Sequence, residues 1–156
     1  MSDRQLRDEV MTLFIAGHET AATTLAWAWS LIATHPEVEQ RLYTEVDTVM
    51  GGRTPTAADL SALTYTRQIV DETLRLYPAA WLVSRSPNAD DVIGNYRVPA
   101  GAMIFLCPYI AHRNVQVWEH PDAFDPQRFT SEAVASRPRH RSSAGRPVAA
   151  GRSFST

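Results

Sequence analysis

Residues 12–33 read TLFIAGHETAATTLAWAWSLIA, and this stretch decides the class of the fold. Apolar residues recur along it at helical spacing, and Arg4–Thr34 contains no proline and one glycine, Gly17. The pattern predicts one long α-helix. The last part of this helix is apolar on most sides, and we expect Met11–Ala33 to be a buried helix of a soluble protein. His18, Glu19 and several hydroxyl residues interrupt the apolar run, so no membrane span is predicted.

The sequence after this helix predicts shorter helices and then a small β-region. Pro36 suits the first turn of a second helix that ends before Gly51-Gly52. Thr56–Asp59 fits a capping box that opens a short helix, and a stronger helix is expected at Thr64–Leu76, stopped by Pro78. The expected strands are Trp81–Ser86, Val92–Val98 and Ala102–Cys107. The predicted fold class is mainly α with a small β-region.

The composition is that of one compact soluble domain: 156 residues, 44% of them hydrophobic and 21% charged. All 15 basic residues are arginine, and 17 acidic residues bring the net charge to -2, which argues against nucleic acid or an acidic membrane as a partner. Cys107 is the only cysteine, so an intrachain disulfide and a cysteine-rich zinc site are excluded. A reducing, cytoplasmic location is expected. No signal peptide is visible, and no metal site built from His and acidic side chains is predicted.

The chain changes character at its C-terminal end. Val115–Phe129 is aromatic and irregular, and we expect its rings to pack against the main body. From Thr130 the apolar periodicity vanishes, and five arginines appear with no acidic residue after Glu132. We therefore expect a domain at residues 1–129 and a disordered region at 130–156. A basic arm that binds nucleic acid is the alternative, but no aromatic platform accompanies the arginines.

The central part of the long helix contains residues that could carry chemistry. Gly17 costs about 1 kcal/mol relative to alanine at a mid-helix position. The missing side chain leaves room for a ligand, and Glu19 and Thr20 could pass a proton into that room. The structural alternative is a packing glycine followed by a threonine bonded back to its own helix.

A second group combines a helix with the irregular segment. Glu72 and Arg75 are three residues apart on the Thr64–Leu76 helix and share one face. Arg128 lies between the aromatic residues Phe124 and Phe129. If Arg128 reached the Glu72–Arg75 pair, the three side chains would form a buried lock between segment and helix.

In this order, the three groups of residues resemble the cytochrome P450 monooxygenases. AGHET at Ala16–Thr20 matches the signature A/G-G-x-D/E-T, ETLR at Glu72–Arg75 matches E-x-x-R, and FDPQRF at Phe124–Phe129 matches F-x-P-x-R-F. The resemblance covers residues 2–129 and continues, damaged, to Phe154. It implies a partial P450 fold, a haem cofactor and O2-dependent hydroxylation of a small hydrophobic substrate, with an electron-transfer protein as partner.

The resemblance also implies individual roles. Glu19 and Thr20 would serve oxygen activation and proton delivery, and Ala16 and Gly17 would border the haem. Arg85 sits where many members of the family contact a haem propionate. The residues implied to form a structural triad behind the haem are Glu72, Arg75 and Arg128.

The sequence departs from the family in the loop that holds the iron. Members of the family ligate the iron through a cysteine thiolate in a loop of the form F-x-x-G-x-R-x-C-x-G. Gly145 and Gly151 match the two glycines, but Ser142, Pro147 and Ala149 stand at the Phe, Arg and Cys positions. Because alanine offers no lone pair to iron, no metal ligand is predicted in this loop.

We therefore expect a catalytically incompetent chain. It begins just before the AGHET helix, so we expect a truncated, pseudogene-like fragment without the N-terminal half of the family fold. Cys107, His18 and His112 are weaker candidates for the iron. The alternative function is an interaction module that associates with another P450 half, a partner protein or a second copy, because an uncovered apolar helix needs a partner.

Overall fold

The long helix predicted from the sequence is present as α1 (Asp3–Ala33) in the computed structural model, which describes residues 1–136 and 154–155. Ser2 and Gln5 form a capping box at its start: the Gln5 N–H donates to Ser2 Oγ over 3.3 Å, and the Ser2 N–H donates to Gln5 Oε1 over 2.9 Å. These two bonds satisfy backbone donors that the first turn leaves open. The helix runs without a break through Gly17.

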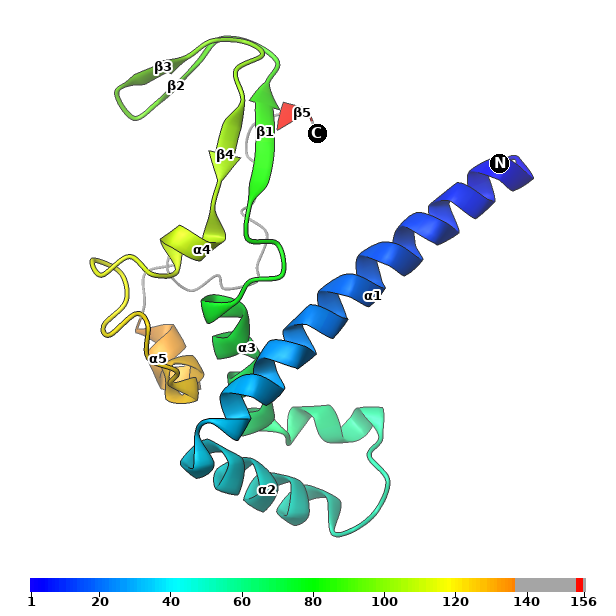
Figure 1. Cartoon of the computed structure of the whole chain (residues 1–156), viewed down its shortest axis with the longest axis vertical. Helices are drawn as coiled ribbons and strands as arrows, with labels where there is room; N and C mark the ends of the chain where they lie inside the picture. Colours follow the sequence, from blue (N-terminus) through cyan, green and yellow to red (C-terminus); the bar gives the residue numbers. More distant parts are fainter. Residues whose placement is uncertain (137–153, 156) are drawn as a thin grey trace.

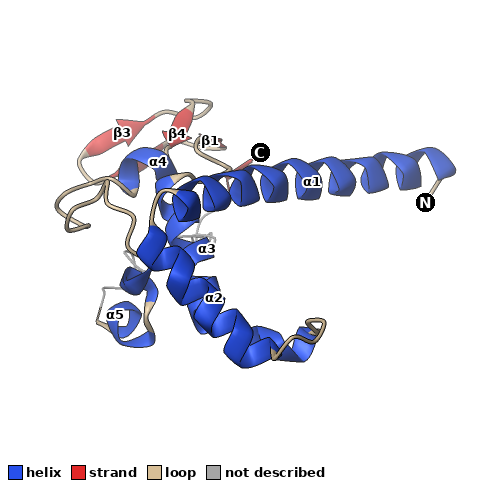
Figure 2. Ribbon diagram, turned by 60° about the horizontal axis from the view of Figure 1, so that its bottom comes forward, coloured by secondary structure: helices blue, strands red, loops and turns tan. Residues whose placement is uncertain are grey.

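Helices α2 (Pro36–Met50), η1 (Ala57–Ser61) and α3 (Thr64–Leu76) follow, as the sequence predicts. Helix α2 begins with proline and ends at Gly51, whose φ of 56° lies in the left-handed region that favours glycine. A capping box between Thr56 and Asp59 opens η1. Figure 2 shows α1 and α2 meeting at an angle, with α3 packed beside their junction.

The hydrophobic core is small and lies at this junction. The cluster consists of Ile32, Val38, Tyr65 and Ile69, with Leu42 and Phe124 packed against it. The Arg41 guanidinium lies 4.1 Å from the centroid of the Tyr65 ring and covers one side of the cluster. Ile69 is the most buried member, so the core fixes the position of α3 relative to the other two helices.

The β-region consists of a three-stranded antiparallel sheet and a hairpin. Strand β1 (Val83–Pro87) lies between β4 (Ile104–Leu106) and β5 (Phe154–Ser155). Strands β2 (Asp91–Ile93) and β3 (Tyr96–Val98) form the hairpin, which lies at one end of the molecule in Figure 1. The strand expected at Val92–Val98 is therefore two strands, because Gly94 adopts a φ of 61° and turns the chain.

The segment after the sheet returns to α3. Helix α4 (Pro108–Ala111) and η2 (Pro126–Phe129) both contact α3, and η2 contacts α5 (Ser131–Ala135). Thr130 begins α5 by accepting the Ala133 N–H on its hydroxyl over 3.2 Å. Regular structure therefore continues past residue 129. The expected disorder therefore does not extend to α5, and it stays a prediction for residues 137–153 and 156, which lie outside the described residues.

Most of α1 is exposed, which corrects the expectation of a buried helix. Ala28 and Ile32 are its only buried residues, whereas Leu13 is 72% exposed, Phe14 66% and Trp29 60%. In Figure 1 the N-terminal half of α1 extends away from the other elements. The apolar side chains of this half are of a kind that is usually buried, but no described element packs against them. No helix in the described part of the chain is long and apolar enough to cross a membrane.

A carboxylate from α2 caps the start of α3. The N-cap position, Leu63, has no polar side chain, and Glu45 takes its place. Glu45 Oε1 accepts the Tyr65 N–H over 2.6 Å, and Oε2 accepts the Thr66 N–H over 2.8 Å and the Thr66 hydroxyl over 2.7 Å. Partial burial alone would raise the pKa of Glu45, but these hydrogen bonds outweigh it and hold the pKa below the ordinary 4.5.

Replacing Glu45 by glutamine should weaken the packing of α2 on α3. We expect Glu45→Gln to lower the free energy of unfolding by about 2 kcal/mol at neutral pH, measured by urea titration, because charge-assisted hydrogen bonds are lost. Because folding lowers the pKa of Glu45, its contribution is present above pH 4.5 and is lost as the pH falls through the folded pKa.

The matched control for this prediction is Asp47→Asn. Asp47 is an exposed acid on the same helix, and its replacement should change the free energy of unfolding by less than about 0.5 kcal/mol. An equal loss of unfolding free energy in Glu45→Gln and Asp47→Asn would contradict the capping role of Glu45.

Candidate functional site

A buried ion pair on α3 is the centre of the candidate site. Arg75 Nε donates to Glu72 Oε2 over 2.6 Å, and Arg75 Nη2 donates to Glu72 Oε1 over 2.8 Å. Both side chains are 0% exposed. A buried ion pair is stable only when its remaining donors and acceptors also have partners. The other partners of Arg75 therefore show which part of the chain the pair binds.

The remaining donors of Arg75 bind the chain that follows the sheet. Nη1 donates to the carbonyl oxygens of His112 over 2.9 Å and Pro121 over 2.6 Å, and Nη2 donates to that of Ala123 over 3.0 Å. The guanidinium also lies 5.1 Å from the centroid of the Trp118 ring, which is buried. One side chain of α3 therefore fixes a segment that lies 37–48 residues later in the sequence.

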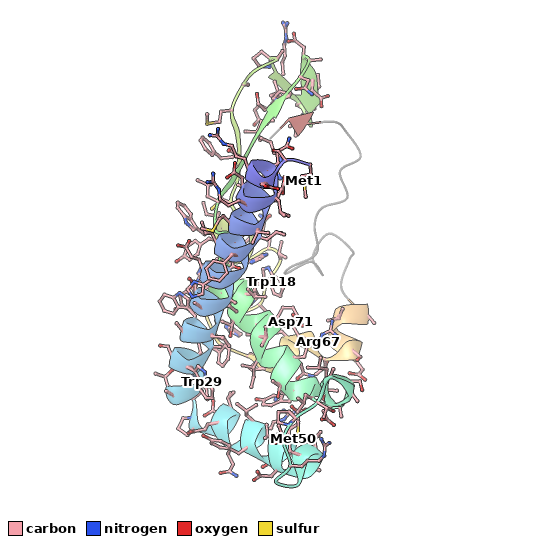
Figure 3. All side chains as sticks on the ribbon, turned by 90° about the vertical axis from the view of Figure 1, so that its right-hand side faces the viewer. Met1, Trp29, Met50, Arg67, Asp71 and Trp118 are labelled. Atoms are coloured by element: carbon pink, nitrogen blue, oxygen red, sulfur yellow. The ribbon has the colours of Figure 1, made fainter. Side chains whose placement is uncertain are left out.

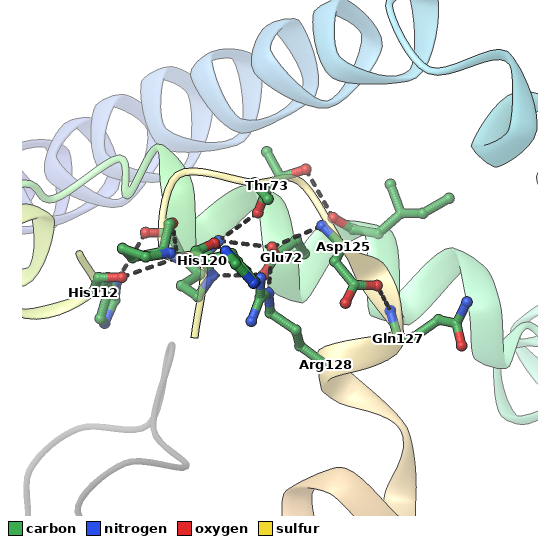
Figure 4. Close-up of polar contacts among 11 residues, drawn as sticks. Glu72, Thr73, His112, His120, Asp125, Gln127 and Arg128 are labelled. Carbon is green, nitrogen blue, oxygen red and sulfur yellow. Dashed lines mark hydrogen bonds and ion pairs between the residues drawn. The ribbon is translucent and has the colours of Figure 1, made fainter. Parts of the chain in front are cut away.

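Arg128 is the third member of the cluster. Its Nε lies 3.4 Å from Glu72 Oε1, and its Nη2 donates to the His120 carbonyl over 3.0 Å. The Asp125 N–H donates to the same Glu72 oxygen over 3.0 Å, as Figure 4 shows. The structure thus brings together Glu72, Arg75 and Arg128 as a lock between helix and segment. Their place behind a haem stays a prediction.

The second candidate group lies on the exposed part of α1. The Thr20 hydroxyl donates to the Ala16 carbonyl over 2.7 Å, so it is bonded back to its own helix. A Cβ added at Gly17 would meet no described atom within 4 Å, so the packing expected of a structural glycine is not present here. Glu19 is exposed. The oxygen-activating and proton-delivering roles of Glu19 and Thr20, and the contact of Ala16 and Gly17 with haem, stay predictions.

Arg85 lies on β1, opposite Ile104 on β4. The Arg85 side chain is half-buried, and its Nη1 donates to the Ser84 carbonyl over 2.7 Å. In the part of the chain that the structure describes, Arg85 forms no ion pair with a carboxylate. A half-buried guanidinium without a carboxylate partner can bind an anionic group such as a propionate. Contact with a haem propionate is the role that the family resemblance implies for Arg85.

The donor set does not fit ligation of a haem iron. Gly145, Ala149 and Gly151 lie outside the described residues, and alanine has no ligand atom whatever its position. Cys107 is a free, half-buried thiol at the start of α4. Within residues 1–136, no three His, Cys, Asp or Glu side chains form a group that could hold a metal ion. The chain has a candidate propionate contact in Arg85 and has no thiolate at the ligand position.

Sequence reasoning missed the backbone acceptors of Arg75. Carbonyl groups of His112, Pro121 and Ala123 bind it, and every residue type carries such a group. The sequence made His112 a weak candidate for the iron and did not name its partners, and the structure shows that its carbonyl and its ring both contact Arg75. The one sequence signal was indirect: an arginine in an apolar helix face needs more acceptors than one carboxylate supplies.

Replacing Arg75 by lysine should break the lock without removing the positive charge. An ammonium cannot serve five acceptors in a plane, so Glu72 and the three carbonyls would lose partners. We expect Arg75→Lys to lower the free energy of unfolding by about 3–5 kcal/mol in a urea titration followed by circular dichroism.

The matched control is Arg67→Lys on the same helix. Arg67 is 83% exposed and its Nε lies 3.9 Å from Asp71 Oδ2; Figure 3 shows both residues on α3. This change should cost less than about 0.5 kcal/mol. Wild-type stability of Arg75→Lys would show that the buried pair does not hold the segment.

Comparison of the sequence with known proteins places the chain in one family. The family model described as Cytochrome P450 matches residues 1–152. The chain is 43% identical over 132 residues to cyclooctatin synthase and 41% identical over 132 residues to cyclooctat-9-en-7-ol 5-monooxygenase, both from Streptomyces melanosporofaciens. It is 37% identical over 136 residues to pentalenene oxygenase from Streptomyces avermitilis. These alignments cover 85%, 85% and 87% of this chain, but 29%, 29% and 30% of the three relatives.

Proposed function

Because the chain belongs to the cytochrome P450 family, we propose that its 156 residues form a segment of a haem-thiolate monooxygenase. The proposed reaction is the O2-dependent hydroxylation of a small hydrophobic organic substrate, with electrons from a redox partner. The relatives named pentalenene oxygenase and cyclooctat-9-en-7-ol 5-monooxygenase support this class of reaction and substrate. The single cysteine supports a reducing, cytoplasmic location.

The Glu72–Arg75–Arg128 cluster carries this proposal. It ties η2 and the preceding segment to α3 by charged hydrogen bonds, and so gives the segment one fixed conformation. In this family, haem supplies the oxygen chemistry, and its iron needs a thiolate ligand. In this proposal, α3 and the segment give the enzyme a rigid support, and Arg85 contacts an anionic group of the haem.

We further propose that the chain by itself is catalytically incompetent. Ala149 stands at the position of the cysteine ligand, and Pro147 stands at that of the arginine in the same loop. Glu19 and Thr20 retain the residue types for proton delivery and oxygen activation, but they lack an iron centre to serve. The proposal therefore assigns these 156 residues the scaffold of a monooxygenase and no reaction step.

The carbon-monoxide difference spectrum of the reduced chain, after incubation with haemin, tests this proposal. We compare the wild type with Ala149→Cys. Because only a thiolate gives the long-wavelength Soret band of this family, the wild type should show none. Such a band in the wild type would overturn the proposed incompetence and point to Cys107, which a Cys107→Ala variant would then abolish. A band gained only by Ala149→Cys would confirm that residue 149 is the missing ligand position.

A second function is favoured by the exposed apolar face of α1. The exposed apolar side chains on this helix are Leu6, Val10, Met11, Leu13, Phe14, Ile15, Leu25, Trp27 and Trp29. Soluble monomers rarely leave so continuous an apolar surface in water. We therefore propose, as the alternative, an interaction module that associates through α1 with another P450 half, with another protein or with itself.

The concentration dependence of the sedimentation coefficient checks this alternative. The wild type should associate, and Leu13→Glu should raise the dissociation constant by about tenfold or more, because a charge enters the apolar face. Thr12→Glu, a matched change at an exposed polar residue one position earlier, should leave association unchanged. A wild-type monomer at every concentration, with no binding to a separately expressed N-terminal P450 half, would contradict the interaction module.

A further inference from the structure

We propose that His112 is a pH-sensitive latch: its neutral imidazole holds residues 112–129 against α3, and its protonation releases them. The proposal concerns a conformational device within the described chain. It does not depend on haem binding or on the proposed enzymatic function.

His112 and Arg75 bind each other in both directions. Arg75 Nη1 donates to the His112 carbonyl over 2.9 Å, and His112 Nδ1 lies 3.1 Å from the Arg75 carbonyl oxygen. Because a carbonyl only accepts, Nδ1 must carry the hydrogen in this contact. The neutral ring therefore has its proton on Nδ1 and an unprotonated Nε2, and protonation would add the second proton to Nε2.

The surroundings of the ring disfavour that second proton. His112 makes an edge contact with Trp118, with ring centroids 6.3 Å apart, so one side of the imidazole is apolar. The charged groups around the latch are Arg75 and Glu72 on α3, Arg113 and Asp122 in the segment, and Arg128 on η2. Glu72 is already bound by two guanidinium groups, and Asp122 is 83% exposed and binds Arg113. Asp125 also lies in the segment, and its N–H binds Glu72. The charges that act on the His112 ring are those of the Arg75 and Arg113 guanidinium groups, and both are positive.

Burial lowers the pKa of His112 below the ordinary 6.5, and the charges of Arg75 and Arg113 lower it further, although hydrogen bonds with the backbone at Arg75 and Leu74 act in the opposite direction. In the released segment the ring returns to water and regains its ordinary pKa. Release therefore takes up a proton as the pH falls below 6.5. The docking of residues 112–129 on α3 is therefore most stable above pH 6.5. It weakens progressively as the pH falls toward the lower pKa that His112 has in the docked state.

Release is local because the ion pair that remains is internal to one helix. Glu72 and Arg75 both belong to α3, so their two hydrogen bonds persist when the segment leaves. What is lost is the set of bonds from Arg75 to the segment, together with the cover over Trp118, which is 4% exposed when the latch is closed. The contacts of the Asp125 N–H and of Arg128 with Glu72, and the packing of Phe124 on the core cluster, are lost with it. Protonation therefore changes a docking equilibrium of the segment and leaves α3 folded.

Hydrogen exchange of the full 156-residue chain, followed by mass spectrometry, measures this equilibrium. As the pH is lowered from about 7.5 to 5.5, the opening equilibrium constant of residues 112–129, obtained from exchange corrected for the intrinsic rate, should rise. The rise should be up to about tenfold for each unit by which the structure lowers the pKa of His112. Peptides from α3 should not change. His112→Gln keeps an N–H donor for the Arg75 carbonyl and cannot titrate, so the rise should disappear.

His120→Asn is the matched control. His120 is an exposed histidine of the same segment, with a φ of 44°, which asparagine tolerates. In this variant, opening of residues 112–129 should increase at low pH as much as in the wild type. An equal increase in His112→Gln would overturn the proposal. A second measurement uses the wild type alone: the His112 ring, titrated by NMR, should show the Nδ1–H tautomer and a pKa below 6.5. A pKa at or above that value would also overturn the latch.

Discussion

The five N–H donors of Arg75 are the constraint on which the rest of this structure depends. Two bind the carboxylate of Glu72 on the same helix, and the others bind carbonyl groups of the segment that follows the sheet. A guanidinium buried at 0% exposure must have every donor satisfied, because each unpaired one would cost free energy that a small core could not supply. The segment therefore has one position in which it satisfies Arg75, and the placement of Trp118, Asp125 and η2 follows from it.

The apolar core performs a different task from this polar cluster. Ile32, Val38, Tyr65 and Ile69 bring α1, α2 and α3 to one junction, but apolar contacts alone tolerate small shifts between helices. Directed hydrogen bonds do not tolerate such shifts. Glu45 fixes the start of α3, and Arg75 fixes its last turn to the segment. Helix α3 is thus held at both ends by charged groups and in the middle by Ile69, which makes it the most constrained element of the described chain.

The sequence was sufficient where structure depends on neighbouring residues. Pro36, Gly51 and Pro78 bound the helices correctly, because caps and breakers act within one turn. It was insufficient where structure depends on distant residues. The periodicity of α1 indicated an apolar helix but could not show that its N-terminal half lies uncovered, and the Arg75 acceptors are main-chain carbonyls that no side-chain pattern records. Glu72, Arg75 and Arg128 were predictable as a set only through their order along the chain, because E-x-x-R spacing alone also describes ordinary surface pairs.

Gly17 decides how the two proposed functions relate to each other. A glycine in the middle of a helix costs about 1 kcal/mol relative to alanine, so a helix selected for its own stability has no use for it. Within the described chain, no atom approaches the place of its missing side chain, so close packing does not offset that cost. The space beside Gly17 has a purpose only when something outside these described residues enters it, whether a haem or another polypeptide. A haem and another polypeptide would compete for this space, so a partner chain that fills it would keep a haem away from Gly17.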